Sequence, residues 1–193
     1  GELLSEAGLL WWATHGTLLG AVRHGGMLRQ STDMDISFWA TPATLTTLGS
    51  IEFRQAAAAL GLVVRYAPLM EMYKVYPLAT KGGVVLDDGW DGINLPTKVI
   101  GKLLEEDEYQ LDWGLYPMRE EGGLLRYMST PNDEYHARCY VPMGEVVSEA
   151  GEDKRRALAF GETFVFAPSS NGVLDCMFGE EWAVLAPRGG EGE

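Results

Sequence analysis

The sequence predicts one α/β (α+β) domain, in which strands and helices are mixed along the chain. Runs rich in apolar, aromatic and β-branched residues alternate with segments whose apolar residues recur at helical spacing. Hydrophobic residues make up 46% of the 193-residue chain and charged residues 22%, which is ordinary for a globular protein with a real core. No internal repeat or linker interrupts the pattern. We expect a single domain over residues 1–187 and a disordered tail at 188–193.

The amino-terminal part predicts a short helix, a strand, a second helix and a second strand. Bulky apolar and aromatic residues in "LLWWATHG" favour a strand that ends at Gly16. Thr17 is a suitable N-cap for the next helix, and Gly25 with Gly26 ends that helix. Apolar and polar residues alternate in "MDISFW", which indicates a strand with one polar face. These elements are expected at 2–8, 9–16, 17–26 and 34–39.

The rest of the chain predicts further helices and strands. A helical region is interrupted near Gly49 and closed by Gly61. Three short apolar runs then fit strands, and Pro96 begins a segment of helical periodicity. The polar, turn-rich stretch at 105–138 predicts no clear element, whereas "ETFVFAP" fits a strand that precedes a short helix. These elements are expected at 41–61, 62–66, 70–78, 82–90, 95–109 and 171–177.

Charge and cysteine content exclude some classes of function. A net charge of -13 argues against a broad nucleic-acid interface, which needs a basic face, but leaves room for a local basic pocket. No apolar run approaches the roughly 18 residues of a membrane span. Cys139 and Cys176 lack any zinc-site spacing, and we expect two buried thiols rather than a mutual disulfide.

Asp33 and Asp35 stand one residue apart at the start of the strand predicted at 34–39. Side chains at i and i+2 of a strand share a face, with Cα atoms about 6.5–7 Å apart. Two converged carboxylates repel each other, so a shared proton or a cation must offset the repulsion. Mg²⁺ is the natural candidate, because it takes oxygen ligands and commonly bridges carboxylates to substrate phosphates. The alternative is a solvated strand face, which is the commoner setting for such a pair.

The turn upstream of the aspartates supplies a second element of a site. A helix that starts at Gly16 and Thr17 presents backbone amides and the positive end of its dipole, both of which favour a phosphate. Together, the turn and the aspartate strand place phosphate donors beside a cation site.

The stretch "GTLLGAVRHGG", followed by "DMDI", resembles the signature of the LicD/fukutin family. Members carry Gly-Thr-Leu-Leu-Gly-x-x-Arg-His-x-Gly and then a run of aspartates that ends in Asp-x-Asp. The later "FAPSSNGVLDCMFGEEW" is similar to the family's closing pattern of a proline, a short helix, an aromatic-glycine pair and a tryptophan. Here these are Pro168, Leu174, Phe178-Gly179 and Trp182.

The resemblance implies a nucleotidyltransferase-like fold, with a small mixed sheet flanked by helices. It also implies transfer of a phosphorylated alcohol, such as phosphocholine or ribitol phosphate, from a cytidine nucleotide donor to a glycan or glycoconjugate. Gly16 and Thr17 would hold donor phosphate, while Asp33 and Asp35 would bind Mg²⁺ or Mn²⁺. A third carboxylate is expected from "VVLDDGW", where Asp87 is favoured over its neighbour Asp88. For a eukaryotic protein the resemblance implies the secretory pathway or the Golgi.

Other polar residues are weaker candidates for the same site. Arg23 is expected to pair with a phosphate, with a structural salt bridge as the alternative. Lys74 is a second cation for donor phosphate, against a solvated strand face. His15 is a possible general base and His24 a structural residue.

Two rival functions follow from the sequence. An Asp-x-Asp glycosyltransferase would use a nucleotide-sugar, but that fold needs a nucleotide-binding half before the aspartates and only 32 residues precede Asp33. A domain that binds without catalysis is suggested by "RQST", because many family members have Pro-Trp-Asp-Asp there.

Overall fold

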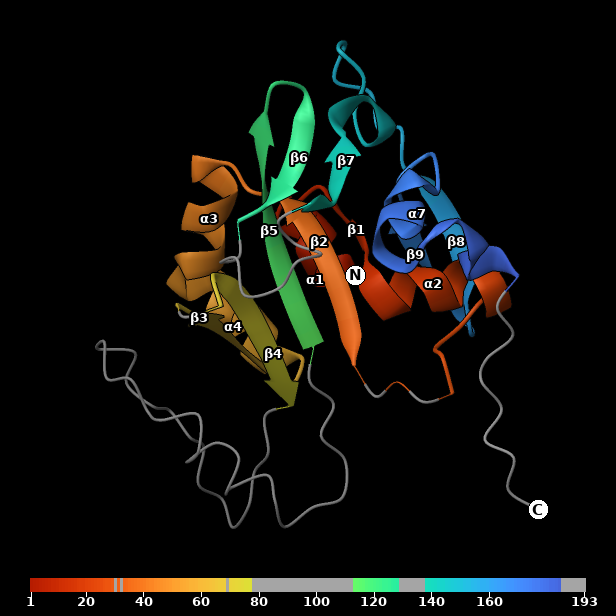
Figure 1. Ribbon diagram of the computed structural model, residues 1–193. Coiled ribbons are helices and arrows are strands. Elements are labelled where there is room, and N and C mark those ends of the chain that lie inside the picture. Colours follow the sequence, from red (N-terminus) through yellow and green to blue (C-terminus); the bar gives the residue numbers. More distant parts are fainter. Residues whose placement is uncertain (30, 32, 69, 78–112, 129–137, 185–193) are drawn as a thin grey trace, which may run out of the picture.

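The computed structural model describes residues 1–29, 31, 33–68, 70–77, 113–128 and 138–184, and these form the α+β fold that the sequence predicts (Figure 1). Within them, seven strands build one mixed sheet whose main path is β1-β2-β5-β4-β3, and β6 and β7 extend it beyond β5. β2 and β5 are parallel, whereas the other neighbours are antiparallel. The strands are β1 (Trp11–Ala13), β2 (Met34–Trp39), β3 (Leu62–Ala67), β4 (Met72–Pro77), β5 (Trp113–Glu121), β6 (Leu124–Tyr127) and β7 (Tyr140–Pro142).

Helices flank the sheet, and a separate hairpin lies beside one of its ends. Figure 1 shows α3 and α4 next to β3 and β4, while α2, α7 and the hairpin lie at the opposite end. The helices are α1 (Glu2–Glu6), α2 (His15–His24), α3 (Pro42–Gly49), α4 (Ile51–Ala59) and α7 (Gly172–Phe178), with 3₁₀ turns η1 (Met143–Glu145) and η2 (Glu180–Ala183). The hairpin consists of β8 (Arg156–Phe160) and β9 (Thr163–Ala167).

Local sequence explains the two helices that follow β2. Thr41 and Thr44 form a reciprocal capping box, and Pro42 occupies the first turn of α3. The Ser50 hydroxyl then accepts the N–H of Phe53 and caps α4, so the predicted interruption near Gly49 is confirmed.

Helix α2 begins two residues earlier than predicted, and the assignment of Thr17 as its N-cap is wrong. Thr14 is the N-cap, and its carbonyl accepts the N–H of Leu18 at 3.0 Å. Thr17 lies inside the helix with 1% of its surface exposed. The predicted end is confirmed, because Gly25 adopts a left-handed conformation with φ of 66° and closes the helix.

The stretch for which the sequence predicts no element contains the central strand of the sheet. β5 lies between β2 and β4, and β6 pairs with it. Gly114 and Pro117 in β5 are poor strand formers, and they mask the signal in "WGLYPM". Pairing with two neighbours overrides that weak local preference.

The hydrophobic core lies between the sheet and the helices. Side chains of the central strands enter this core, among them Ile36, Phe38 and Leu115, and Ser37 between the first two is buried as well. Leu48 and Phe53 of α3 and α4 belong to the same buried cluster. This packing explains why the strand pattern at 34–39 could be predicted from sequence.

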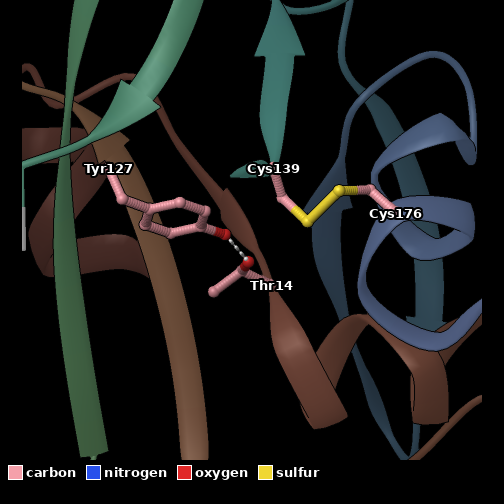
Figure 2. The surroundings of a disulfide bond; sticks show 4 residues. All are labelled: Thr14, Tyr127, Cys139 and Cys176. Atoms are coloured by element: carbon pink, nitrogen blue, oxygen red, sulfur yellow. Dashed lines mark hydrogen bonds between the residues drawn. A yellow bond between two sulfur atoms is a disulfide. The ribbon is translucent and has the colours of Figure 1, made fainter. Parts of the chain in front are cut away.

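Cys139 and Cys176 form a disulfide, so the prediction of two buried thiols is wrong. Their Cα atoms lie 5.7 Å apart although the residues are separated by 37 positions. Cys139 is buried just before β7, and Cys176 lies in α7 (Figure 2). The bridge ties the sheet to α7, a proximity that exists only in the folded chain.

Some predicted elements lie outside the described residues, namely the strand at 82–90, the helix at 95–109 and the tail at 188–193. A single domain over 1–187 therefore stays a prediction. Among the helices that the structure does describe, none has both the length and the apolar character needed to cross a bilayer.

Candidate functional site

The site is built around Asp35, which lies partly buried near the start of β2. Asp35 is in register with Gly114 of β5, and Gly114 is in register with Lys74 of β4. Paired residues of neighbouring strands point to the same face, so Asp35 and Lys74 share a face on either side of a glycine. Two strand spacings separate their backbones by about 10 Å. The predicted metal ligand and the predicted phosphate cation therefore lie on the same face of the sheet.

The first turn of α2 is hydrogen-bonded to the backbone of Asp35. The Thr17 hydroxyl oxygen Oγ1 accepts the N–H of Asp35 at 2.8 Å. The N–H of Thr14 donates to the carbonyl of Asp35 at 3.0 Å. Both backbone groups of Asp35 are thus held by residues at the start of α2, and the two predicted halves of the site are joined directly.

Thr14 does not cap α2 with its side chain, because its hydroxyl has another partner. The Thr14 and Tyr127 hydroxyl oxygens lie 2.6 Å apart in a buried hydrogen bond (Figure 2). Within the described part of the chain, no hydrogen bond reaches the N–H of Gly16 or Thr17. These amides of the first turn are suited to an anion, as the sequence predicts, although the Thr17 hydroxyl is already used by Asp35.

Tyr127 is a neutral hydrogen-bonding group at this position. Burial raises its pKa to about 12, and the nearby Asp35 carboxylate adds to the rise, while the hydrogen bond with Thr14 works in the opposite direction. The phenol therefore keeps its proton at neutral pH. Its partner Thr14 also donates its backbone N–H to the Asp35 carbonyl, so Tyr127 and Asp35 are linked through one residue.

His15 lies between the two threonines and has an unusual backbone conformation. Its φ of 48° is in the left-handed region, which is rare for a residue other than glycine. Its ring centroid lies 4.7 Å from that of Tyr116 and 5.5 Å from that of Tyr127. Such strain is concentrated at functional sites and requires firm surroundings, which the two tyrosines provide here.

Asp33 is exposed and directly precedes β2. The Ser31 hydroxyl donates to the carbonyl of Asp33 at 3.2 Å, so a local turn leads into the strand. Asp33 and Asp35 retain the spacing that the sequence predicts, but only Asp35 is held within the sheet. The aspartate pair therefore combines one residue whose backbone is held within the sheet with one residue at its edge.

Arg23 and His24 occupy the last turn of α2, whereas Gly16 and Thr17 are in its first. Seven residues of helix separate Gly16 from Arg23 by about 10 Å. The helix thus does not bring Arg23 close to the first-turn amides. Basic residues in the last turn also interact favourably with the helix dipole.

The predicted third carboxylate, Asp87, lies outside the described residues, as does its neighbour Asp88. Within the part of the chain that the structure covers, no three histidine, cysteine, aspartate or glutamate residues are grouped as a metal site. Two aspartates with phosphate oxygens nevertheless fit the usual coordination of Mg²⁺. The donor set available here is compatible with a divalent cation held together with substrate.

Four site residues escaped prediction: Thr14, Gly114, Tyr116 and Tyr127. Thr14 was assigned to a strand that ends before it in the structure. The other three belong to the stretch that predicts no element, although "WGLYPM" is rich in bulky apolar and aromatic residues that could have indicated a strand.

The closing pattern near the end of the chain folds into α7 and η2. Leu174 is fully buried, and the indole N–H of Trp182 donates to Asp175 Oδ1 at 2.6 Å. Gly179 separates the two helices with φ of 78°. The disulfide ties α7 to the sheet, so this pattern supports the site from outside.

Residues 8–87 match the family model of the LicD/FKTN/FKRP nucleotidyltransferase domain. No curated protein sequence matches the chain. The match contains α2, the aspartate strand and β4, and it reaches to Asp87. The resemblance to the LicD/fukutin family is confirmed over this segment, whereas β5 and the closing pattern lie outside it.

Proposed function

We propose that this chain, whose residues 8–87 match the LicD/FKTN/FKRP nucleotidyltransferase domain, is a metal-dependent phosphotransferase. It would move a phosphorylated alcohol of the phosphocholine or ribitol-phosphate type from a cytidine nucleotide donor to a glycan or glycoconjugate. The observation that carries the proposal is the hydrogen bond from the Asp35 N–H to Thr17. It joins the anion-binding start of α2 to the aspartate strand.

Asp33 and Asp35 would hold Mg²⁺ or Mn²⁺ together with phosphate oxygens of the donor, and Asp87 is the proposed third ligand. The bound cation would neutralise charge on the transferred phosphoryl group. Support comes from the fixed backbone of Asp35 and from the oxygen-rich donor set.

The donor phosphates would be bound from two sides. On one side, the backbone N–H groups of Gly16 and Thr17 in the first turn of α2 would bind the phosphate. Lys74 approaches from β4 on the same face of the sheet as Asp35. Arg23 would contribute only from the far end of α2. The Thr17 hydroxyl positions Asp35 in this scheme, and only its N–H serves the phosphate.

The reaction follows from this arrangement. An acceptor hydroxyl oxygen bonds to the phosphorus that carries the alcohol, and the bond from that phosphorus to the oxygen of the cytidine monophosphate breaks. The hydroxyl proton passes to a carboxylate, for which Asp87 is the proposed base. First-turn amides and Lys74 stabilise charge on the phosphoryl oxygens.

A binding domain without catalysis is the second candidate, and "RQST" at residues 29–32 favours it. The final two aspartates are retained, so cation binding is compatible with both. A glycosyltransferase is less well supported, because the matched domain is of the nucleotidyltransferase type.

Thermal shift with Mn²⁺ and different nucleotides separates these functions. We expect stabilisation by Mn²⁺ with CDP-ribitol or CDP-choline, and little by Mn²⁺ with UDP-sugars. A shift with UDP-sugars alone would favour the glycosyltransferase. Incubation with the stabilising donor and a glycan acceptor, followed by measurement of released cytidine monophosphate, then distinguishes a transferase from a binding domain. The disulfide suits an oxidising compartment, so the assay uses protein prepared without reductant.

A further inference from the structure

Gly114 occupies the position of β5 that faces Asp35, and it has no room for a side chain. A Cβ atom built there would lie 2.6 Å from Tyr116 Cε2, 2.8 Å from Met72 Cε and 3.0 Å from Asp35 Oδ1. Of these three atoms, one belongs to the carboxylate of the candidate metal ligand. The absence of a Cβ therefore lets a carboxylate oxygen come close to the backbone of the central strand.

Backbone conformation does not explain this glycine. Its φ is outside the left-handed region, and it sits within a regular strand paired on both sides. Glycine in such a place is typically destabilising by about 0.5–1 kcal/mol relative to alanine. The remaining reason is space, since glycine in a strand interior commonly marks a close approach by another group.

The two other neighbours of this position are poorly able to move. Met72 is buried, with 1% of its surface exposed. The Tyr116 ring packs against His15 and lies edge-on to Tyr127, with centroids 6.1 Å apart. The backbone of Asp35 is fixed by Thr14 and Thr17, so a Cβ atom at position 114 would have to be accommodated by a shift of the Asp35 carboxylate as well.

We infer that Gly114 is a positioning residue, which sets the place of the Asp35 carboxylate and thereby the affinity of the site for a divalent cation. The inference rests on the proposed function, because it takes Asp35 as a metal ligand. It adds β5, which lies outside the matched segment, to the groups that determine cation binding. Gly114 itself contacts neither the cation nor the substrate.

The test is a Mn²⁺ titration of Gly114→Ala, in which the electron paramagnetic resonance signal of free Mn²⁺ reports how much metal is bound. The Mn²⁺ binding that the wild type shows and Asp35→Asn lacks is taken as binding at the candidate site. Gly144→Ala is the matched control, because a Cβ there meets no atom within 4 Å and its φ needs no glycine. We expect Gly114→Ala to weaken the Asp35-dependent binding about tenfold or more, as changes next to metal ligands commonly do. Gly144→Ala should bind as the wild type does.

Thermal unfolding without metal separates positioning from general damage. If Gly114→Ala is too unstable to measure, Gly114→Ala/Met72→Ala removes the contact with the methionine methyl and keeps those with Tyr116 and Asp35. Its thermal unfolding shows whether it folds despite the loss of a buried side chain, and the folded double variant should still bind Mn²⁺ weakly. Wild-type affinity in either folded variant overturns the inference while leaving the proposed function intact. Absence of any Asp35-dependent Mn²⁺ binding in the wild type overturns both.

Discussion

Thr17 accepts the backbone N–H of Asp35 at 2.8 Å, and this bond joins the first turn of α2 to the strand that carries the aspartates. Thr17 is nearly inaccessible, with 1% of its surface exposed. A hydroxyl of this kind is therefore structural, and it fixes the residue on which the proposed chemistry depends.

Thr17→Val removes that acceptor while keeping the shape of the side chain. The N–H of Asp35 then loses a partner in a partly buried setting, which typically costs about 1–3 kcal/mol. We expect the free energy of unfolding in urea to fall by that amount and the affinity for Mn²⁺ to fall with it. Thr17→Ser keeps the hydroxyl and should lose little of either. Equal stability of Thr17→Val and the wild type would contradict the claim that the Thr17 hydroxyl holds Asp35 in place.

The buried pair of Thr14 and Tyr127 should show coupling in a double-mutant cycle. Tyr127→Phe and Thr14→Val each break this hydrogen bond by removing one of its hydroxyls, whereas the double variant removes both. Each single change is expected to cost about 1–3 kcal/mol, and the double variant should cost less than their sum. Chemical denaturation of the four proteins measures the coupling. Strictly additive effects would mean that the bond contributes nothing to stability.

Reduction of the disulfide should destabilise the fold. Loop-closure entropy for a bridge spanning 37 residues gives roughly 4 kcal/mol at 25 °C. For a chain of this size, each kcal/mol shifts the melting temperature by about 2–4 °C. Calorimetry with and without reductant measures the shift. Cys139→Ala/Cys176→Ala should melt at the lower temperature in both conditions, and a wild type unaffected by reductant would contradict the bridge.

Asp153 should make stability depend on pH in the acid range. Its pKa is lowered by hydrogen bonds to Arg155, whose guanidinium lies at 2.7 and 2.9 Å from the two carboxylate oxygens and also donates to the carbonyl of Trp11. A lowered folded-state pKa gives stability that is present above the unfolded value of about 3.9 and is lost as the pH falls through the folded value. Since Asp153 is about half exposed, the effect should be at most about 1 kcal/mol.

Asp153→Asn isolates this contribution. The variant should be less stable than the wild type at pH 7, and the difference should shrink below about pH 4 as the wild-type carboxylate takes up its proton. Urea unfolding at several pH values follows the difference. A gap that stays constant down to about pH 2 would exclude ionisation of Asp153 as its cause.

Much of the fold and half of the site could be predicted because their signals are local. The strand at 34–39, the glycine after α2 and the interruption near Gly49 depend on neighbouring residues, and the structure has all three, although Ser37 on the expected polar face is buried. β5 could not be predicted in this way. Its strand conformation depends on pairing with β2 and β4, which overrides the weak preference of Gly114 and Pro117.

The remaining differences have the same physical origin. Thr17 looks like an N-cap in sequence, but the Thr14 carbonyl begins the helix and frees the Thr17 hydroxyl for Asp35. The cysteines pair because α7 folds back onto the sheet, which no spacing in the sequence indicates. The roles of Gly16, Arg23, Lys74 and Asp87 in binding stay predictions.

The most direct test is the stabilisation of Asp35→Asn by Mn²⁺ with a cytidine nucleotide, measured as a thermal shift beside the wild type. Asp153→Asn is the control. It also replaces an aspartate by asparagine, but Asp153 precedes β8 and has no role in the proposed site. We expect a clear metal-dependent shift in the wild type and in Asp153→Asn, and its loss in Asp35→Asn. A full metal-dependent shift in Asp35→Asn would contradict the assignment of Asp35 as the centre of the site.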